Sequence, residues 1–345
     1  MSVITYKCPN CGGELKFDPE SQSYHCEYCL SDFSQDAVEQ LEPDRGQEQQ
    51  GQEQPGAAVV YSCPSCGAQI VTEETTAATF CYYCHNPVVL SGRLEGEYLP
   101  DAIIPFKVGR EQALEAFEKF VKGRRFVPRS FYRKDQVEKL TGVYFPFWSC
   151  GCSLRGSMEA AATNVRIWRV GDIEYTETKK YQISRAGELN FPDMTKNALH
   201  KANRMLVEAV QPFDLEKVQP FSMAYLSGFQ AEKRDMERES FREEFREDCR
   251  RYTRELLLET VSGYASVTPQ NTEVDILEED WRYLLLPVWV LTYRGKDNRL
   301  YYYAMNGQSG KTAGDLPTDM PKAAAFSGVL ALVVLILFLI GGYLI

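Results

Sequence analysis

The feature that most constrains this chain is a cysteine pattern that occurs twice near the N-terminus. In each copy, two C-x2-C pairs are separated by 14 residues. The eight cysteines are Cys8, Cys11, Cys26 and Cys29 in the first copy, and Cys63, Cys66, Cys81 and Cys84 in the second. A C-x2-C turn presents two thiolates on one side of a tight loop, and two such turns joined by a short hairpin form a closed tetrahedral site. The sequence therefore predicts two zinc ribbons and two zinc ions per chain.

Four cysteine ligands leave no coordination position open to water, so both zinc ions are expected to be structural rather than catalytic. His25 and His85 each adjoin a ligand cysteine. We expect both to be surface residues, with spare ligands as the alternative. Gly12 and Gly67 follow the second cysteine of each copy, where the chain needs a positive φ angle to leave the turn.

Composition divides the rest of the chain. Residues 42–56 are almost entirely Gln, Glu, Gly, Pro and Asp, which predicts a flexible linker and ribbons that move independently. The fold class is α+β. The expected parts are zinc ribbon 1 (1–35), the linker (36–58), zinc ribbon 2 (59–95), an α+β domain (96–314), a juxtamembrane linker (315–322) and a transmembrane helix (323–345).

The C-terminal segment, 323–345, is 23 residues without a charged side chain. As a helix it would span roughly 35 Å, against a hydrocarbon core of about 30 Å. Lys311 and Lys322 precede it, and the positive-inside bias then places residues 1–322 in the cytoplasm. We expect a single-pass, tail-anchored protein of the cell membrane, with a buried core helix as the alternative.

Charge distribution bears on the partners. Residues 1–95 carry four basic and fourteen acidic side chains, so this stretch accounts for the net charge of −10. Nucleic-acid binding requires Lys and Arg to neutralise phosphates, so a protein partner is favoured and nucleic acid is the alternative. Tyr28, Tyr82 and Tyr83 would offer aromatic surface to a protein, or would stack on single-stranded bases.

A basic stretch lies farther along the chain. Residues 107–134 hold nine basic and three acidic side chains. We expect a solvated face that pairs with the acidic ribbons. Contact with anionic lipid headgroups is the alternative, since the chain is tethered to a membrane nearby.

Periodicity predicts the elements of the middle region. Apolar residues on one face predict a helix over 110–122, and an apolar seam predicts a long charged helix over about 232–262. Gly171-Asp172 predicts a two-residue hairpin turn. A Pro-x-Trp motif occurs in two apolar segments, 142–155 and 284–293, which we interpret as a weak internal repeat of a helix-plus-strand unit.

Three further cysteines and a glycine-rich loop have local interpretations. Cys150 and Cys152 would point the same way in a strand; two small packed side chains are favoured, and a thiol-dependent enzyme is the alternative. Cys249 lies on the apolar seam and is expected to be buried. Residues 307–312 resemble a phosphate-binding loop, but Met305 stands where that motif needs glycine. We predict no catalytic residue, no ATPase or helicase activity and no enzyme.

Several motifs together resemble a known family. They are Cys-Pro-x-Cys-Gly, found twice, with Ile104–Lys107, Gly142–Trp148, Tyr225–Lys233 and Asn306–Lys311. In combination they are similar to bacterial transcription factor IIB-type zinc-ribbon membrane proteins. Members are sometimes labelled a primosomal replication-restart helicase, a label that this sequence does not support because it lacks the helicase motifs. The expected function is a membrane-anchored zinc-ribbon adaptor that recruits a protein partner.

Overall fold

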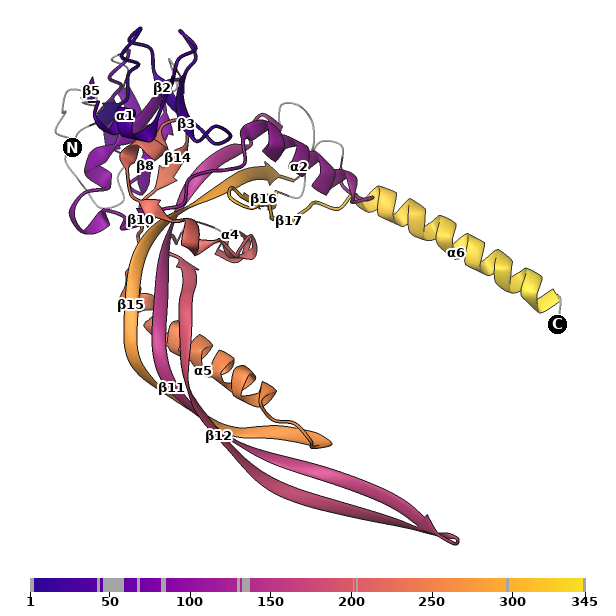
Figure 1. The fold of residues 1–345 in the computed structure, drawn as a ribbon. Helices are drawn as coiled ribbons and strands as arrows, with labels where there is room; N and C mark the ends of the chain where they lie inside the picture. Colours follow the sequence, from indigo (N-terminus) through magenta and orange to yellow (C-terminus); the bar gives the residue numbers. More distant parts are fainter. Residues whose placement is uncertain are drawn as a thin grey trace. The chain divides into compact units, whose positions relative to one another are not determined.

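The computed structural model describes residues 3–41, 44–45, 59–66, 69–81, 85–128, 131, 137–200, 202, 204–295 and 298–343. Helices and strands are mixed throughout (Figure 1), as the α+β fold class requires. The chain forms two compact units. Unit 1 comprises Met1–Pro146, Leu199–Asp235 and Leu285–Ile345, and unit 2 comprises Phe147–Ala198 and Met236–Leu284. The structure therefore divides the predicted 96–314 domain, because two long strand segments and a helix within it form a compact unit of their own.

The two ribbons form the N-terminal part of unit 1. Ribbon 1 contains β1 (Val3–Thr5), β2 (Leu15–Asp18), β3 (Ser23–Cys26), β4 (Asp32–Phe33), α1 (Gln35–Glu39) and β5 (Asp44–Arg45). Ribbon 2 contains β6 (Val59–Ser62), β7 (Gln69–Thr72), β8 (Thr76–Phe80) and β9 (Pro87–Leu90), followed by the 3₁₀ turns η1 (Ser91–Arg93) and η2 (Gly96–Tyr98). Strands β2, β3 and β4 form one small sheet, and β6 pairs with β7.

The ribbons are joined rather than independent. Strand β1 of ribbon 1 pairs antiparallel with β9 of ribbon 2, with Ile4 opposite Val89. Ile4, Val89 and Leu90 are buried. The prediction of separately moving ribbons, made from linker composition alone, is therefore wrong. Composition indicates whether the segment between the ribbons is flexible, but it does not indicate whether strands on either side of that segment pair with each other.

The predicted linker, 36–58, contains secondary structure at its start. Helix α1 begins after Ser34, whose side chain accepts a hydrogen bond from the Ala37 backbone N–H, as an N-cap residue does. Val38 of this helix is buried. Strand β5 then pairs with β1. The rest of the linker, 42–43 and 46–58, lies outside the described residues.

The remainder of unit 1 surrounds an aromatic core. Its elements are β10 (Ala102–Ile103), α2 (Arg110–Lys122), the start of β11 (Thr141–Val170), α4 (Arg204–Ala209), η4 (Leu215–Lys217), β13 (Gln219–Pro220), η5 (Met223–Leu226), β14 (Gln230–Glu232), the end of β15 (Ser266–Arg294), β16 (Leu300–Asn306), β17 (Thr312–Asp315) and α6 (Met320–Tyr343). Phe106 stacks on Phe229 with ring centroids 4.2 Å apart and meets Trp289 edge-on at 5.3 Å. Helix α2 has the predicted bounds and buries Ala113, Phe117 and Val121.

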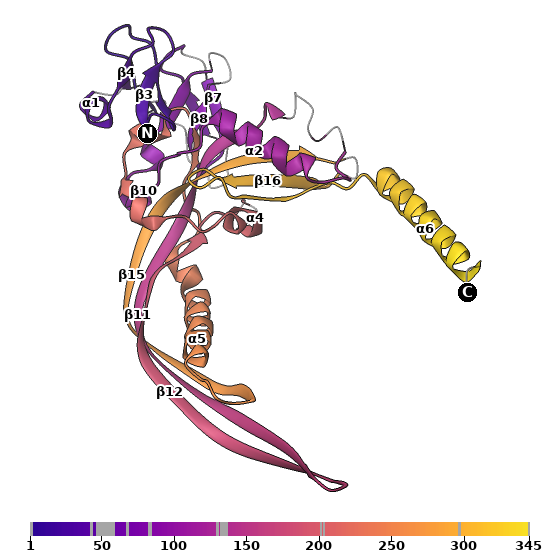
Figure 2. The ribbon, with the colours of Figure 1, turned by 45° about the vertical axis from the view of Figure 1, so that its right-hand side comes forward.

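Unit 2 consists of long strands with one helix against them. Strands β11 and β12 (Ile173–Asn197) form an antiparallel hairpin whose turn is Gly171-Asp172, as predicted. Helix α5 (Arg242–Glu259) lies along one face of the β11, β12 and β15 strands in both views (Figure 1, Figure 2). The predicted helix over 232–262 is thus shorter, because η6 (Arg238–Phe241) precedes it and Thr260 caps its C-terminus.

Close packing holds α5 on the strands. A Cβ atom at Gly156 would collide with the Thr253 side chain, so glycine is needed where β11 meets the helix. Two apolar clusters fill the interface, one around Leu154 and Cys249 and one around Met158 and Leu257. Cys249 is therefore buried, as predicted.

The C-terminal helix, α6, begins three residues before the predicted span. Its window Met320–Leu337 has a mean hydropathy of 2.1, and none of it is buried within the chain. The helix is long and apolar enough to cross a membrane. The backbone N–H of Asp319 donates to the Phe126 carbonyl, so the start of α6 is attached to the segment that follows α2.

The two Pro-x-Trp motifs both lie in strands, at the predicted places. The Trp148 indole donates to the Met236 carbonyl at 2.9 Å, and the Trp289 indole donates to the Val108 carbonyl at 3.0 Å. Each buried tryptophan thus anchors a segment distant in sequence. The proposed internal repeat stays a prediction.

Candidate metal centres

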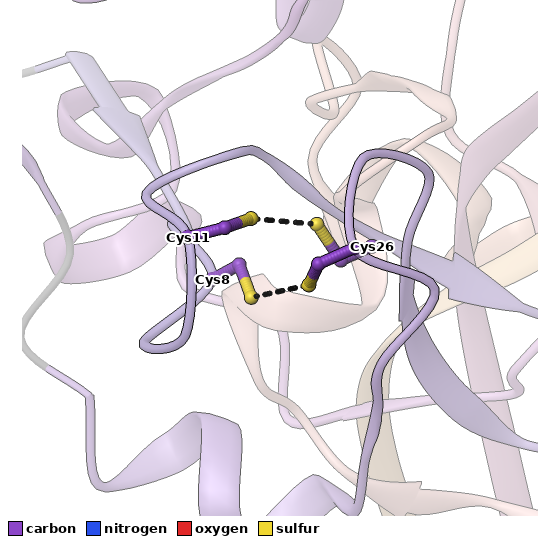
Figure 3. Close-up of side chains that lie close together, drawn as sticks. Cys8, Cys11 and Cys26 are labelled. Atoms are coloured by element: carbon purple, nitrogen blue, oxygen red, sulfur yellow. Dashed lines mark hydrogen bonds between the residues drawn. The ribbon is translucent and has the colours of Figure 1, made fainter.

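Ribbon 1 brings its four predicted ligands together. The Sγ atoms of Cys8 and Cys29 lie 3.5 Å apart, as do those of Cys11 and Cys26. All four Sγ atoms lie within 4.8 Å of one another. Figure 3 shows the sulfurs of the two loops pointing toward each other. Cys8 and Cys26 are buried, whereas Cys11 and Cys29 reach the surface.

These distances fit a tetrahedral metal site. With zinc–sulfur bonds of about 2.3 Å, neighbouring sulfurs of a regular tetrahedron lie about 3.8 Å apart. The 3.5 Å separations in ribbon 1 are close to that edge length. The cysteines of ribbon 1 can therefore hold zinc in a closed site without an open position for substrate.

The backbone of each turn has the same construction. In ribbon 1 the Gly12 N–H donates to the Cys8 carbonyl and the Leu30 N–H donates to the Cys26 carbonyl. Gly12 and Leu30 both have positive φ angles, of 73° and 58°. The glycine was predicted; the leucine was not. Aligning the two C-x2-C turns would have predicted the positive φ angle of Leu30, because Leu30 follows Cys29 as Gly12 follows Cys11.

The contacts of the two exposed sulfurs shift their pKa values in opposite directions. The Gly13 N–H donates to Cys11 Sγ at 3.4 Å, and Cys29 Sγ lies 3.3 Å from Ser31 Oγ. The hydrogen bond with Ser31 lowers the pKa of the Cys29 thiol to about 6. The Gly13 N–H lowers the pKa of the Cys11 thiol, but the neighbouring cysteines and burial outweigh it and raise that pKa to about 12. Ser31 is itself held by Asn10, whose side chain donates to it.

Ribbon 2 repeats this arrangement in its described part. The Sγ atoms of Cys63, Cys66 and Cys81 lie within 4.8 Å of one another, and those of Cys66 and Cys81 are 3.7 Å apart. The predicted fourth ligand, Cys84, lies outside the described residues, as do Gly67, Tyr82 and Tyr83. The His85 N–H donates to the Cys81 carbonyl, as the Leu30 N–H does to that of Cys26.

The two histidines have contacts of their own in the ribbons. His25 Nδ1 lies 2.8 Å from an Asp32 carboxylate oxygen, so its ring is held on the neighbouring strand. His85 has a φ angle of 60° and takes the position that corresponds to Leu30. In the described part of the chain, neither belongs to a group with metal-ligand geometry.

Sequence reasoning missed the residue that joins the two centres. Glu14 of ribbon 1 accepts hydrogen bonds from the side chains of Ser65 and Asn86 of ribbon 2. Ser65 lies inside a C-x2-C pair, and Asn86 lies two residues after the last ligand. Glu14 is only 8% exposed, and burial raises the pKa of its carboxyl. No sequence signal marks this carboxylate, because its partners are 51 and 72 residues away.

The three other cysteines pack inside unit 2. Cys152 Sγ lies 3.3 Å from Cys249 Sγ, and all three of Cys150, Cys152 and Cys249 are buried. Burial raises the pKa of the Cys150 thiol to about 12. Cys150 and Cys152 are thus packed side chains, as favoured, and the sulfur that contacts Cys152 belongs to Cys249 on α5. A register shift interrupts the regular pairing of β11 with β12 between Cys150 and Cys152.

The loop that resembles a phosphate-binding motif has a structural role. Asn306 donates to the carbonyls of Val210 and Pro212, and the Lys311 amine donates to the Gln211 carbonyl. The side chains of this loop thus hold the 210–212 segment. Lys311 is used within the fold, at the position where a phosphate-binding loop would direct a lysine to nucleotide.

Comparison with known proteins places the chain in a family. The chain is 33% identical over 347 residues to the uncharacterized protein YdjG of Bacillus subtilis, covering 99% of this chain and 100% of that protein. The chain belongs to the same family as YdjG. No protein-family model matches the sequence. No solved structure matches it either.

Proposed function

We propose that this chain is a membrane-anchored adaptor that recruits a protein partner, with structural zinc in both ribbons and no catalysis. In this proposal α6 is a C-terminal membrane anchor, and residues 1–322 lie in the cytoplasm. Lys322, at the start of the apolar run, supports that orientation. The cysteine geometry supports zinc, since four thiolates in a closed tetrahedron are typical of structural zinc sites.

The observation that carries the proposal is apolar surface on the hairpin of unit 2. Strand β15 begins opposite Thr163, whose carbonyl accepts a hydrogen bond from the Ala265 N–H. Beyond that point β11 and β12 continue as two strands (Figure 1). Exposed apolar side chains cover this tip, which we call the hairpin tip: Val165, Ile167, Trp168, Val170, Ile173 and Tyr175.

The hairpin tip has no interior of its own to account for these residues. Ile167 and Trp168 are neighbours in a strand and so point to opposite faces, and they are 61% and 40% exposed. Both faces of the hairpin tip therefore carry apolar side chains that the described part of the chain leaves exposed. Contiguous exposed apolar surface of this kind marks interaction sites.

Ribbon 1 adds a second apolar surface. Tyr28 and Leu30 lie on the turn that carries Cys29 and are 77% and 72% exposed. Leu30 keeps a positive φ angle there, a conformation that is costly for a leucine. Strained, exposed apolar residues are found where a site has a function. The acidic charge of residues 1–95 favours a protein over nucleic acid as the partner.

Site-specific photocrosslinking in living cells tests the adaptor function. A photoreactive amino acid at Tyr175 or at Tyr28 should capture a defined protein, and the double substitution Ile167→Ser with Val170→Ser should abolish capture from Tyr175. The matched control carries the photoreactive residue at exposed Glu255 of α5, outside the hairpin tip, with Lys180→Ser as its substitution. Capture that is equal at all positions would reject the proposal, as would crosslinks to nucleic acid alone.

A further inference from the structure

The segment that follows α2 forms a basic pocket together with the first residues of α6. The pocket has a volume of about 690 Å³. Its lining contains four cations, one acid and three valines: Lys122, Arg124, Arg125, Lys322, Glu118, Val121, Val127 and Val137. Val121 and Val127 are buried, so the pocket has an apolar floor below a cationic rim.

The contacts of Arg124 and Arg125 leave their hydrogen-bond donors available. Arg124 lies over the Phe120 ring at 5.1 Å, and Arg125 lies over the Phe326 ring at 5.9 Å. Neither guanidinium has a carboxylate within ion-pair distance in the described part of the chain. Lys122 and Lys322 instead pair with Glu118 and Asp319. These cation–π contacts restrain the two side chains, and a guanidinium group can bind an anion through two parallel hydrogen bonds.

Direct contacts fix the pocket at the beginning of the apolar helix. The Lys322 amine approaches the Val127 carbonyl at 3.4 Å. Phe126 packs edge-on against Phe326, with ring centroids 5.5 Å apart. Phe326 lies within the apolar run, one turn after Lys322. A membrane that accepts this run therefore places residues 124–127 at the level of the lipid headgroups, where aromatic side chains commonly lie.

We propose that this pocket binds the phosphate of one anionic phospholipid headgroup, with the glycerol region of the lipid against the valine floor. This inference rests on the proposed membrane anchorage by α6. Two guanidinium groups match a phosphodiester, which presents two free oxygens. Basic pockets beside a membrane helix on the cytoplasmic side are suited to such headgroups. The pocket gives a specific place to the lipid contact that the basic composition of residues 107–134 suggested only as an alternative.

Spin-labelled lipids test the proposal on the full chain. The zinc-loaded protein is reconstituted in phosphatidylcholine nanodiscs that contain a minority of spin-labelled phosphatidylglycerol, and the motionally restricted lipid is counted per chain. One restricted anionic lipid per chain is expected. The double substitution Arg124→Gln with Arg125→Gln should weaken this selectivity by roughly tenfold or more, since it removes two charge-assisted contacts.

A matched control is available in unit 2. Arg250 and Arg254 line another basic pocket, of about 420 Å³, that includes no residue of α6. The double substitution Arg250→Gln with Arg254→Gln removes the same charge and should leave the restricted lipid unchanged. An equal loss in both variants would show diffuse attraction and overturn the pocket, as would full retention after Arg124→Gln with Arg125→Gln.

Two further measurements distinguish failure of the membrane anchor from failure of the headgroup site. A chain that does not co-purify with nanodiscs would reject the anchor, and the headgroup site with it. A chain that co-purifies but restricts phosphatidylcholine and phosphatidylglycerol equally would reject the site alone. Titration of the protein in phosphatidylcholine discs with glycerol 3-phosphate should give no resolvable binding. Tight binding there would assign the pocket to a soluble phosphate compound instead.

Discussion

Both units bring cysteine sulfurs into contact, but by different means. In ribbon 1 two turns of one short hairpin hold four sulfurs within 4.8 Å of one another, and Cys11 and Cys29 reach the surface. In unit 2 the close pair, Cys152 and Cys249, is 97 residues apart and is buried among apolar side chains. Metal binding needs sulfurs that lose protons and converge, whereas buried thiols act as small apolar groups. Cysteine proximity alone therefore does not define a site.

In the ribbon pair and in unit 2, a charged side chain joins two segments that are distant in sequence. Glu14 joins the two ribbons through Ser65 and Asn86. Lys196 of β12 lies 2.7 Å from Glu244 and 2.8 Å from Asp248 of α5. A cysteine cluster with metal-site geometry and a buried carboxylate thus characterise the ribbons, whereas apolar packing with an ion pair characterises unit 2. The two regions should respond to different perturbations.

Zinc removal should give the largest difference between the regions. Structural zinc contributes roughly 10–16 kcal/mol in small zinc-binding domains, so chelation should unfold the ribbons and leave unit 2 folded. Hydrogen exchange on the full chain, with and without chelator, measures both regions at once. Equal loss of protection in α5 and in β2 and β3 would contradict the comparison.

Single cysteine substitutions sharpen the same test. Cys26→Ala should lower the zinc content from two ions per chain to one, because the two sites share no ligand. Cys249→Ala should leave two ions bound, since this cysteine packs in unit 2. Metal analysis of the purified proteins distinguishes them. A loss of zinc in Cys249→Ala would reveal a link between the regions that their separate cysteine clusters do not suggest.

Removal of the Lys196 amine should destabilise unit 2 by about 2–3 kcal/mol, because Asp248 is largely buried and loses a charged partner. Burial lowers the pKa of Lys196, but Asp248 and Glu244 outweigh this effect and raise it overall. Its stabilising contribution is therefore complete at neutral pH and is lost only as the pH rises through that raised pKa. Urea unfolding of Lys196→Met, followed through α5, measures the effect.

Lys179→Met is the control for that substitution. Lys179 lies 3.7 Å from Glu177 and its side chain is 59% exposed, so its removal should cost less than about 1 kcal/mol. A comparable loss in both variants would mean that Lys196 does not stabilise the packing of α5.

Glu14→Ala should destabilise the ribbon pair by about 1–3 kcal/mol, since Ser65 and Asn86 lose their acceptor. Glu14→Gln keeps that acceptor. Burial raises the pKa of Glu14, with hydrogen bonds from Ser65 and Asn86 only partly offsetting it. The folded state therefore favours the protonated form, and the advantage of Gln over Glu should be largest at neutral pH and shrink toward pH 4.5.

Thermal unfolding of the zinc-loaded chain at several pH values, above the range of acid release of zinc, measures this difference. Unit 2 serves as the internal reference. A Gln variant that is less stable than Glu at neutral pH would show that the charged form of Glu14 is the stabilising one.

Leu30→Gly should have the smallest effect on stability. Unlike Lys196→Met and Glu14→Ala, it should stabilise the protein. Relief of a left-handed leucine is worth about 1–2 kcal/mol, and the added backbone entropy of glycine offsets roughly 0.5–1 kcal/mol of it. A small net stabilisation of ribbon 1 should accompany weaker crosslinking of the partner from Tyr28. Leu99→Gly, at an exposed leucine with φ of −70°, should instead destabilise.

Much of the local structure was readable from spacing. Residues 110–122 form the predicted helix because its apolar positions repeat with helical period. Gly171-Asp172 turns the predicted hairpin because a two-residue turn matches the twist of its strands. The boundaries of the long helix were less accurate, since charged residues before Arg242 carry no signal that separates a 3₁₀ turn from an α-helix.

The candidate metal centres were likewise predicted only in part. The described ligands were found from their spacing, because a C-x2-C turn closes within a few residues. The joining of the ribbons by Glu14 and by β1 with β9 was not found, and the linker composition pointed to the opposite conclusion. The pairing of β1 with β9 depends on how the two ribbons come together in the fold. The composition of the polar linker between them carries no information about that pairing.

The sequence by itself determined the cysteine sets, the helix over 110–122 and the apolar C-terminal helix, because each depends on neighbours within a few residues or one helical turn. The tertiary structure alone decided that Cys249 is the neighbour of Cys152 and that Lys322 joins Arg124 and Arg125 around one pocket. Those contacts join segments about 100 or 200 residues apart. Only the pairing of long strands and the packing of helices against them bring such segments together.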